Sequence, residues 1–288
     1  MLYRCGYGFN IRMGIRFTMK TILFLFNSSR YAVQPWLDDG RYHCVSVDHS
    51  DTDHSATERP QWTHPRHSRI DVDLAGRDAD KRVDNALAGL MLPAPSFIFS
   101  MAPCTNLAVS GAAHYARKRR DNPDFQTEAV ALARLVLAWD CPSIVENPVS
   151  VLATMWKKPT GYVHPYEFQR LLPVDDVHPE FPEYYPPQDI YNKKTGLWCS
   201  NGAKMPHHYM IDKRPEGEVN PCHKMLGGKS ARTKYIRSLT PRGMAKAIYL
   251  ANSPLLQDTS EYTHDTMRFF YDEQGARGLA CPMKRSVT

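Results

Sequence analysis

PSFIFSMAPCTNLAVS, residues Pro95–Ser110, contains the short apolar run Phe97-Ile98-Phe99, which leads into a tight turn around Cys104. A short run of aromatic and β-branched residues between prolines is typical of a buried parallel strand. Ligands bind at the carboxyl ends of such strands, so a cysteine in this turn is a candidate nucleophile. Chemically inert buried thiols are common, and the position alone therefore also fits an ordinary core residue.

A second short strand is predicted at residues 142–148, PSIVENP, and it ends in Glu146 and Asn147. The segment between the two strands, TEAVALARLVLAW from Thr127 to Trp139, predicts a crossover helix with Thr127 as its N-cap. A right-handed crossover sets the two strands parallel, so we expect Cys104 and Glu146 to open into one cleft. The alternative for Glu146 is a solvated or helix-capping carboxylate.

These turns resemble motifs of DNA cytosine carbon-5 methyltransferases. Ala102-Pro103-Cys104 is similar to their Pro-Cys nucleophile turn, and Glu146-Asn147-Pro148 is similar to their Glu-Asn-Val turn. The phage-type subset of the family is closer still, and the resemblance spans roughly Lys20 to Ala251. The further segments that carry it are Lys193-Lys194-Thr195-Gly196-Leu197-Trp198, Cys222-His223-Lys224 and Arg237-Ser238-Leu239-Thr240-Pro241.

The resemblance implies a fold, an activity and two catalytic residues. The fold would be the Rossmann-like α/β fold of class I methyltransferases, a mostly parallel sheet flanked by helices, with a small irregular target-recognition lobe. The activity would be methyl transfer from S-adenosylmethionine to carbon 5 of cytosine in DNA. The Cys104 thiolate would add to carbon 6 of the ring, and Glu146 would stabilise the charge that develops toward N3. Such enzymes flip the target base out of the duplex.

The turn that would bind the cofactor departs from the family pattern. The apolar strand predicted at residues 20–26, KTILFLF, is followed by a turn with the sequence Phe26-Asn27-Ser28-Ser29-Arg30. The corresponding turn of the family resembles Phe-Ser-Gly-x-Gly. Phe26 matches, while Ser28 and Arg30 occupy glycine positions, and glycine allows close backbone approach and unusual dihedral angles. Three alternatives follow: a modified loop that binds S-adenosylmethionine, a different cofactor, or loss of cofactor binding.

Later segments match the cofactor motifs better. The strand predicted at residues 42–48, YHCVSVD, ends in Asp48, where adenosine-binding folds place a carboxylate for the ribose hydroxyls. A surface turn is the alternative for Asp48. Thr240-Pro241 is expected to cap a helix over residues 242–250 that resembles the family's last motif. The cofactor-binding residues that the resemblance implies are Phe26, Asn27, Ser28, Ser29, Asp48, His49, Asp73, Pro103, Ser238 and Thr240.

Basic segments are candidates for phosphate contact. The run ARKRR at residues 116–120 follows Cys104, and lysines 193 and 194 lie where the family carries a basic motif. A solvated helix face is the ordinary alternative for such a run. Residues 224–242 are basic and contain glycine, which favours a flexible loop. The expected DNA contacts are Arg117, Lys118, Arg119, Arg120, Lys193, Lys194 and Lys229.

Composition sets the remaining limits. The 288 residues are 42% hydrophobic and carry a net charge of +6, which permits a polyanionic partner without requiring one. Seven cysteines without paired spacing and no secretion signal favour a reducing compartment, the cytoplasm or a host's cytoplasm for a phage protein. No apolar stretch reaches the roughly 20 residues that span a bilayer. The histidines and cysteines lack regular ligand spacing, so no metal site is expected.

Four regions are predicted along the chain. They are a tail at 1–19, an α/β catalytic and cofactor-binding domain at 20–160, a loop-rich target-recognition region at 161–236, and a C-terminal helix and tail at 237–288. Two other functions stay open beside methyl transfer. One is the same scaffold with an unusual cofactor or a modified pyrimidine or nucleotide substrate, and the other is a catalytically silent DNA-binding or interaction protein.

Overall fold

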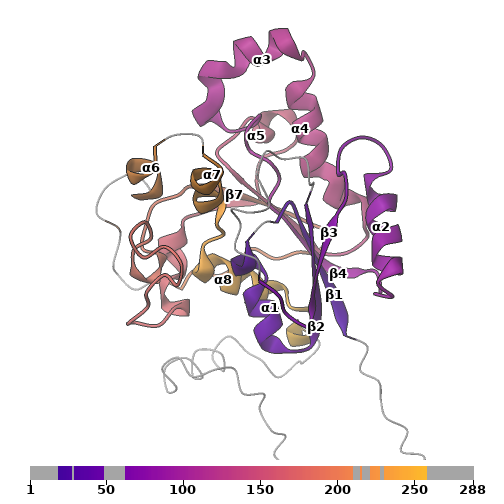
Figure 1. Ribbon diagram of the computed structural model, residues 1–288, viewed down its shortest axis with the longest axis vertical. Coiled ribbons are helices and arrows are strands. Elements are labelled where there is room, and N and C mark those ends of the chain that lie inside the picture. The colour runs from indigo at the N-terminus through magenta and orange to yellow at the C-terminus, as the bar shows by residue number, and fades with distance from the viewer. Residues whose placement is uncertain are drawn as a thin grey trace, which may run out of the picture.

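The computed structural model describes residues 19–27, 29–48, 62–209, 215, 221–227 and 230–257. A seven-stranded sheet in the order β3-β2-β1-β4-β5-β7-β6 forms the centre of this part of the chain (Figure 1). The strands are β1 (Lys20–Leu25), β2 (Tyr42–Asp48), β3 (His67–Asp71), β4 (Pro95–Ser100), β5 (Ser143–Pro148), β6 (Gly161–Val163) and β7 (Thr195–Ser200).

Strands β1 to β5 run parallel, and β7 pairs antiparallel with both β5 and β6. The predicted α/β class with a mostly parallel sheet is confirmed. Strand order reverses direction at β1, which lies between β2 and β4, and this is the topological switch point of a doubly wound sheet. Ligands of such sheets bind outside the carboxyl ends of the strands at this point. The turn that carries Cys104 follows β4 and therefore lies at that edge.

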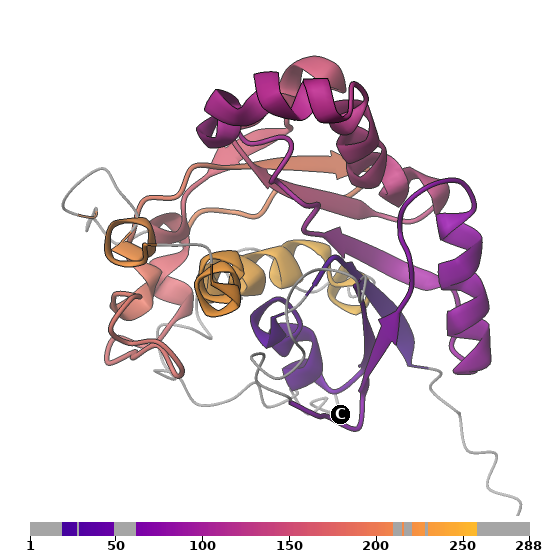
Figure 2. The same cartoon turned by 45° about the horizontal axis from the view of Figure 1, so that its top comes forward.

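Successive side chains of each strand point to opposite faces of the sheet, and a hydrophobic core lies on each face. Ile22 and Phe24 pack on one side with α1 (Gln34–Asp39) and α8 (Arg242–Asn252). Leu23 and Leu25 pack on the other side with α2 (Ala79–Gly89) and α4 (Phe125–Arg134). Figure 2 shows α1 and α8 on one face of the sheet and α2 on the other. Both faces are covered, which explains why these strands are continuous apolar runs.

The remaining helices are short. They are α3 (Tyr115–Asp121), α5 (Leu152–Met155), α6 (Pro221–Met225), α7 (Ala231–Ser238), α9 (Pro254–Gln257) and the 3₁₀ helices η1 (Arg30–Ala32), η3 (Val109–His114), η4 (Leu135–Ala138), η5 (Pro165–Leu171) and η6 (Pro187–Asp189). No helix in the part of the chain that the structure describes is long and apolar enough to cross a membrane.

Three local predictions are corrected. The crossover helix begins at Phe125, so Thr127 lies inside it and Asp124 occupies the N-cap position. Residues 231–238 form α7 rather than a flexible loop, with Ser230 as N-cap accepting from the Thr233 amide. Thr240 does not cap α8: the Asp189 carboxylate accepts from the Arg242 amide at 2.6 Å, and Asp189 is distant in the sequence. Long-range contacts thus set helix ends that local patterns misplace.

A third core lies in the irregular part of the chain. It is rich in aromatic side chains and contains Tyr31, Phe181, Tyr185, Tyr191, Cys222, Leu226, Tyr235, Ile236 and Leu239. Glu180 joins it to the turn after β1, since its carboxylate accepts from the Tyr31 hydroxyl at 2.9 Å and lies 3.2 Å from Arg30 Nε. The proposed boundary at residue 161 stays a prediction, and β6 and β7, which follow it, belong to the central sheet.

Candidate functional site

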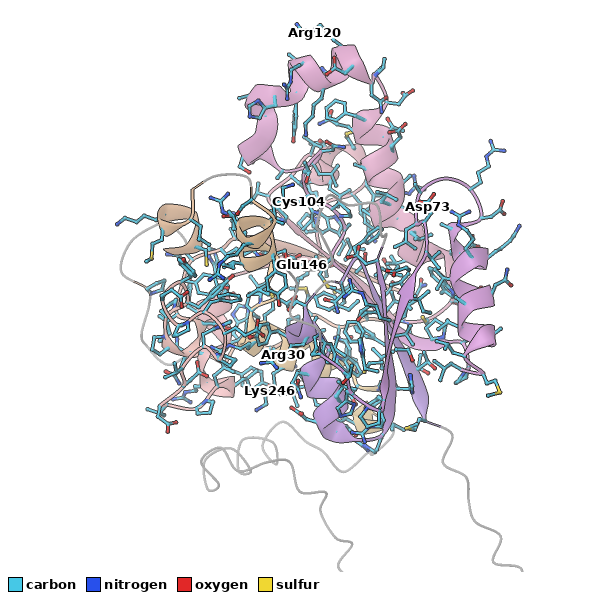
Figure 3. The ribbon with its side chains drawn as sticks, in the orientation of Figure 1. Arg30, Asp73, Cys104, Arg120, Glu146 and Lys246 are labelled. Carbon is cyan, nitrogen blue, oxygen red and sulfur yellow. The ribbon has the colours of Figure 1, made fainter. Side chains whose placement is uncertain are left out.

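Cys104 and Glu146 lie at the carboxyl ends of the neighbouring parallel strands β4 and β5 (Figure 3). The backbone carbonyl of Cys104 accepts from the amides of Leu107 and Ala108, which closes the turn. Asn147, fully buried, donates from Nδ2 to the carbonyl of Ala102 at 2.8 Å. This bond ties the two strand ends together, so the thiol and the carboxylate are held at one edge as the sequence predicted.

Three charges or potential charges meet at this edge. Cys104 is exposed as a residue, yet the surrounding loop and strand ends desolvate its thiol and raise the thiol's pKa. The carboxylate of Glu146 raises the pKa of Cys104 further, and the ammonium of Lys193 opposes both effects. At neutral pH the thiol is therefore mostly protonated, and nucleophilic attack requires a change of charge in the site.

Glu146 carries the clearest sign of a binding role. Its Oε1 is buried and has no hydrogen-bond partner among the described residues, and the side chain is only 13% exposed. The nearest cation is Lys193, whose Nζ lies 4.0 Å from this oxygen, too far for a hydrogen bond. Buried acceptors in folded proteins are nearly always satisfied. An unpartnered carboxylate oxygen beside an accessible thiol therefore indicates a place for a ligand's N–H or O–H group.

Lys193 and Lys194 directly precede β7, and their side chains lie near different residues. Lys193 approaches Glu146. Lys194 is exposed and lies over the ring of Tyr162, with Nζ 4.7 Å from the ring centre. Both lysines were expected to contact DNA phosphates. The geometry adds an electrostatic role for Lys193 toward Cys104 and Glu146, and the phosphate contacts stay predictions.

The basic run after Cys104 forms α3, which projects from the body of the molecule (Figure 1). Lys118 Nζ donates to the carbonyl of Thr105 and to Asn106 Oδ1, both at 2.8 Å, so it braces the Cys104 turn. Arg119 donates to Gln126 at 3.2 Å. Arg120 lies at the outer end of α3, well away from Cys104, as labelled in Figure 3. Arg117 and Arg120 are exposed and are the run's best candidates for contact with a polyanion.

The turn after β1 is held by its own polar side chains. Asn27 is buried, donates to Ser46 Oγ at 3.0 Å and accepts from the Ser29 amide at 3.1 Å. Ser29 Oγ accepts from the Tyr31 amide. Among the described residues of this turn only Phe26 has a positive φ, 57°, so Arg30 is not in a conformation that needs glycine. The replacement of glycine by arginine instead changes access to the turn, because position 30 now carries a long side chain that extends toward Glu180.

Two of the residues expected to bind the adenosine part of a cofactor are carboxylates near the ends of β2 and β3. Asp48 ends β2 and Asp73 follows β3, so both carboxylates lie at the ligand-binding edge. Asp48 is nearly buried, and Arg69 Nη2 is 4.0 Å from its Oδ2. Asp73 is exposed and accepts from the Ala75 amide through Oδ1. The two carboxylates can accept hydrogen bonds from ribose hydroxyls and an adenine amino group, whereas the first turn presents the Arg30 guanidinium where the methyltransferases that the sequence resembles have glycine.

The other predicted cofactor contacts are dispersed. Pro103 is exposed beside Cys104, Ser238 is exposed at the end of α7, and Thr240 is buried before α8. Ser238 Oγ donates to the carbonyl of Tyr235. Ser28, His49 and Lys229 lie outside the described residues, as do most of the predicted tails.

Asn147 and Glu180 have contacts near the site that the sequence did not predict, and Lys193, expected only as a DNA contact, also lies near Glu146. Asn147 stood within the quoted Glu-Asn-Pro motif, so a capping role for its amide could have been suspected. Nothing local indicates that Glu180 meets the turn after β1. No group of three or more His, Cys, Asp or Glu side chains suited to a metal ion occurs within the described ranges. No protein-family model matches the chain, and no curated protein is significantly similar to it.

Glu146→Gln is expected to lower the pKa of the Cys104 thiol and to speed its alkylation at neutral pH. The substitution removes the negative charge that raises this pKa, while the positive charge of Lys193, which lowers it, remains. Lys193→Met is expected to do the opposite. Alkylation by iodoacetamide, followed across pH by mass spectrometry of the Cys104 peptide, measures both. Glu128→Gln, an exposed carboxylate on α4, is the matched control. An unchanged pH midpoint in Glu146→Gln would refute the coupling.

Proposed function

We propose that this chain methylates carbon 5 of cytosine in DNA, with Cys104 as nucleophile and Glu146 as the group that binds N3 of the ring. The observation that carries the proposal is the buried, unpartnered Oε1 of Glu146 beside the accessible thiol. A pyrimidine ring presents polar atoms on the edge that contains N3 and an electrophilic carbon, carbon 6, on the opposite side. That arrangement suits a carboxyl group and a thiol brought together by adjacent strands.

The chemistry follows from these two groups. The Cys104 thiol loses its proton to solvent, its sulfur forms a bond to carbon 6, and the electron pair of the 5,6 double bond shifts toward carbon 5 and the N3 side. Glu146 supplies the proton or hydrogen bond that balances the charge at N3. In methyl transfer, carbon 5 would take the methyl group from a sulfonium donor, which would leave as a neutral thioether. The proton on carbon 5 would then pass to solvent, the pair of that carbon–hydrogen bond would re-form the 5,6 double bond as the sulfur–carbon bond breaks, and the proton at N3 would return to Glu146.

Uptake of a proton by Glu146 together with the bound ring also helps to explain how a thiol with a raised pKa is activated. A protonated Glu146 that donates to the N3 lone pair carries no charge and no longer raises the pKa of Cys104, while the ammonium of Lys193 stays in place. The balance of charge then favours the thiolate. Substrate binding and nucleophile activation are coupled in this account through a single carboxylate.

S-adenosylmethionine would supply an electrophilic methyl group. Asp48 and Asp73 are the residues that would hold its adenosine part. DNA would lie over the exposed cations near the same edge, among them Arg117 and Lys194. These contacts give affinity that depends on salt and carries little sequence information. The loop-rich residues 161–236 would then select the target sequence.

The direct test is transfer of a radiolabelled methyl group from S-adenosylmethionine to DNA by the full chain. We expect label in 5-methylcytosine after hydrolysis of the DNA. Glu146→Gln is expected to lower the rate by about 10²–10³-fold, the effect of removing one preorganised group from a charge-stabilising site. Glu128→Gln should retain the full rate. Label in any other base, or none with a folded protein, would contradict the proposal.

Arg30 favours a second candidate. Its guanidinium occupies a position where the family has glycine and pairs with Glu180, which points to a donor other than S-adenosylmethionine on the same scaffold. Calorimetry and adduct formation together distinguish the two candidate functions. Isothermal calorimetry without detectable heat for S-adenosylmethionine, together with a Cys104 adduct on a pyrimidine probe, would favour the second.

A further inference from the structure

Aromatic rings and lysines alternate over the outer strands of the sheet, on the face opposite to Glu146. Trp156 stacks with Trp198, their ring centres 6.5 Å apart and their planes at 14°. Lys157 Nζ lies 4.8 Å from the ring centre of Trp156, and Lys194 Nζ lies 4.7 Å from that of Tyr162. We refer to Trp156, Lys157, Tyr162, Lys194 and Trp198 as the lysine–aromatic strip.

Gly196 allows the strip to be continuous. It pairs with Tyr162 across β6 and β7, and a methyl group placed on it would come within 2.8 Å of the Trp198 ring and 3.3 Å of Tyr162. The two rings therefore approach each other over a residue without a side chain. Trp198 is fully buried and forms the base, whereas Tyr162 is 39% exposed and presents its ring to solvent.

The strip is positively charged. Lys157, Lys158 and Lys194 are all exposed, and within the described part of the chain none of the three pairs with a carboxylate. Lys157 donates to Ser200 Oγ at 3.1 Å, a neutral partner that leaves its charge uncompensated. An exposed aromatic ring, here that of Tyr162, beside cations without carboxylate partners is the combination by which proteins bind single-stranded nucleic acid, through base stacking and phosphate contact.

The energetics allow a base to replace a lysine over the ring. A lysine over an exposed ring shifts an equilibrium by about 2–5-fold, whereas stacking of a nucleobase shifts it by about 5–150-fold. The displaced ammonium of Lys194 is then free to pair with the phosphate next to the stacked base. The existing contact therefore holds the ring and the cation ready without blocking the ligand.

The strip lies close to the candidate site. β7 separates Tyr162 from Asn147, so the two are about 10 Å apart, two interstrand spacings, and Asn147 bonds the Cys104 turn. We propose that the lysine–aromatic strip binds unpaired nucleotides of a DNA or RNA single strand, with a base stacked on Tyr162 and phosphates on Lys157 and Lys194. This site does not rest on the chemistry proposed at Cys104.

Fluorescence anisotropy with a labelled single strand of about a dozen nucleotides tests the proposal, in a Cys104→Ser background that excludes covalent capture. Tyr162→Leu keeps an apolar side chain but removes the ring, and it is expected to weaken binding about 5–150-fold. Tyr162→Phe should bind like the parent. Lys194→Ala is expected to lower the slope of log affinity against log salt by about 0.7.

Met91→Ala, a residue 92% exposed at the end of α2, is the control for loss of exposed apolar surface and should bind like the parent. Equal binding by Tyr162→Leu and Tyr162→Phe would overturn the proposal, as would equal affinity for the fully annealed duplex. This test is independent of the test of the proposed function. Methyl transfer can be measured even if the strip binds no nucleic acid, and binding of a single strand can be measured even if the protein transfers no methyl group.

Discussion

Cys104→Ser is expected to abolish the covalent complex between this protein and DNA that contains 5-fluorocytosine. Fluorine at carbon 5 cannot leave as a proton does, so the sulfur–carbon bond of the adduct persists once the methyl group is added. A serine hydroxyl is a far weaker nucleophile than a thiolate. We expect loss of at least about 10³-fold in adduct, which is close to complete loss on a denaturing gel.

The trapping experiment separates the nucleophile from other thiols. Cys199→Ser is the matched control, because Cys199 is a partly exposed cysteine on the neighbouring β7 and should be dispensable. Mass spectrometry of the adduct peptide should place the modification on Cys104. A stable adduct in Cys104→Ser, or a modified peptide that contains another cysteine, would exclude the proposed nucleophile whatever the cofactor.

Arg242→Met is expected to be the most destabilising substitution at a single ion pair in this fold. Arg242 Nη2 lies 2.7 Å from Asp176 Oδ2 and 2.9 Å from Asp189 Oδ1, and all three side chains are at least 88% buried. Removing the guanidinium leaves two carboxylates without their cation in a desolvated position. Such a break costs about 3–5 kcal/mol, which corresponds to roughly 6–20 °C in Tm for a chain of this size.

The effect should extend beyond local stability. Asp189 also accepts from the amides of Arg242 and Gly243 and so caps α8, which covers one face of the sheet. Thermal unfolding followed by circular dichroism measures the change. Arg242→Lys keeps the charge but loses the two-pronged bond, and it should lie between the parent and Arg242→Met. Lys81→Met removes a fully exposed partner of Asp78 and should leave Tm unchanged. An Arg242→Met protein as stable as the parent would refute this account.

Two acidic residues of the irregular segment show why charge counted along a sequence misleads. Counted along the sequence, Asp176 and Glu180 add negative charge that would repel phosphates. In the structure Asp176 neutralises Arg242, and Glu180 binds Tyr31 and Arg30. Both carboxylates pair with cations of the protein itself, so this segment repels a polyanion less than its composition suggests.

The sheet and the two principal site residues follow from the sequence because their determinants are local. Short apolar runs bounded by proline or polar turns marked β2, β4 and β5, and residues 42–48 match β2 throughout. Once adjacent strands are parallel, residues that follow them must share an edge. Cys104 and Glu146 therefore come together by topology alone.

The partners of those residues depend on the folded chain, since they come from distant segments. Lys193 reaches Glu146 because β7 enters the sheet antiparallel to β5, and nothing near either residue specifies that pairing. Asp189 caps α8, and the rings of Tyr162 and Trp198 both lie over Gly196, for the same reason. Local periodicity thus fixed which residues lie at the reactive edge. Long-range packing decided which charges and rings surround them, because burial and electrostatics depend on distance in space rather than separation along the chain.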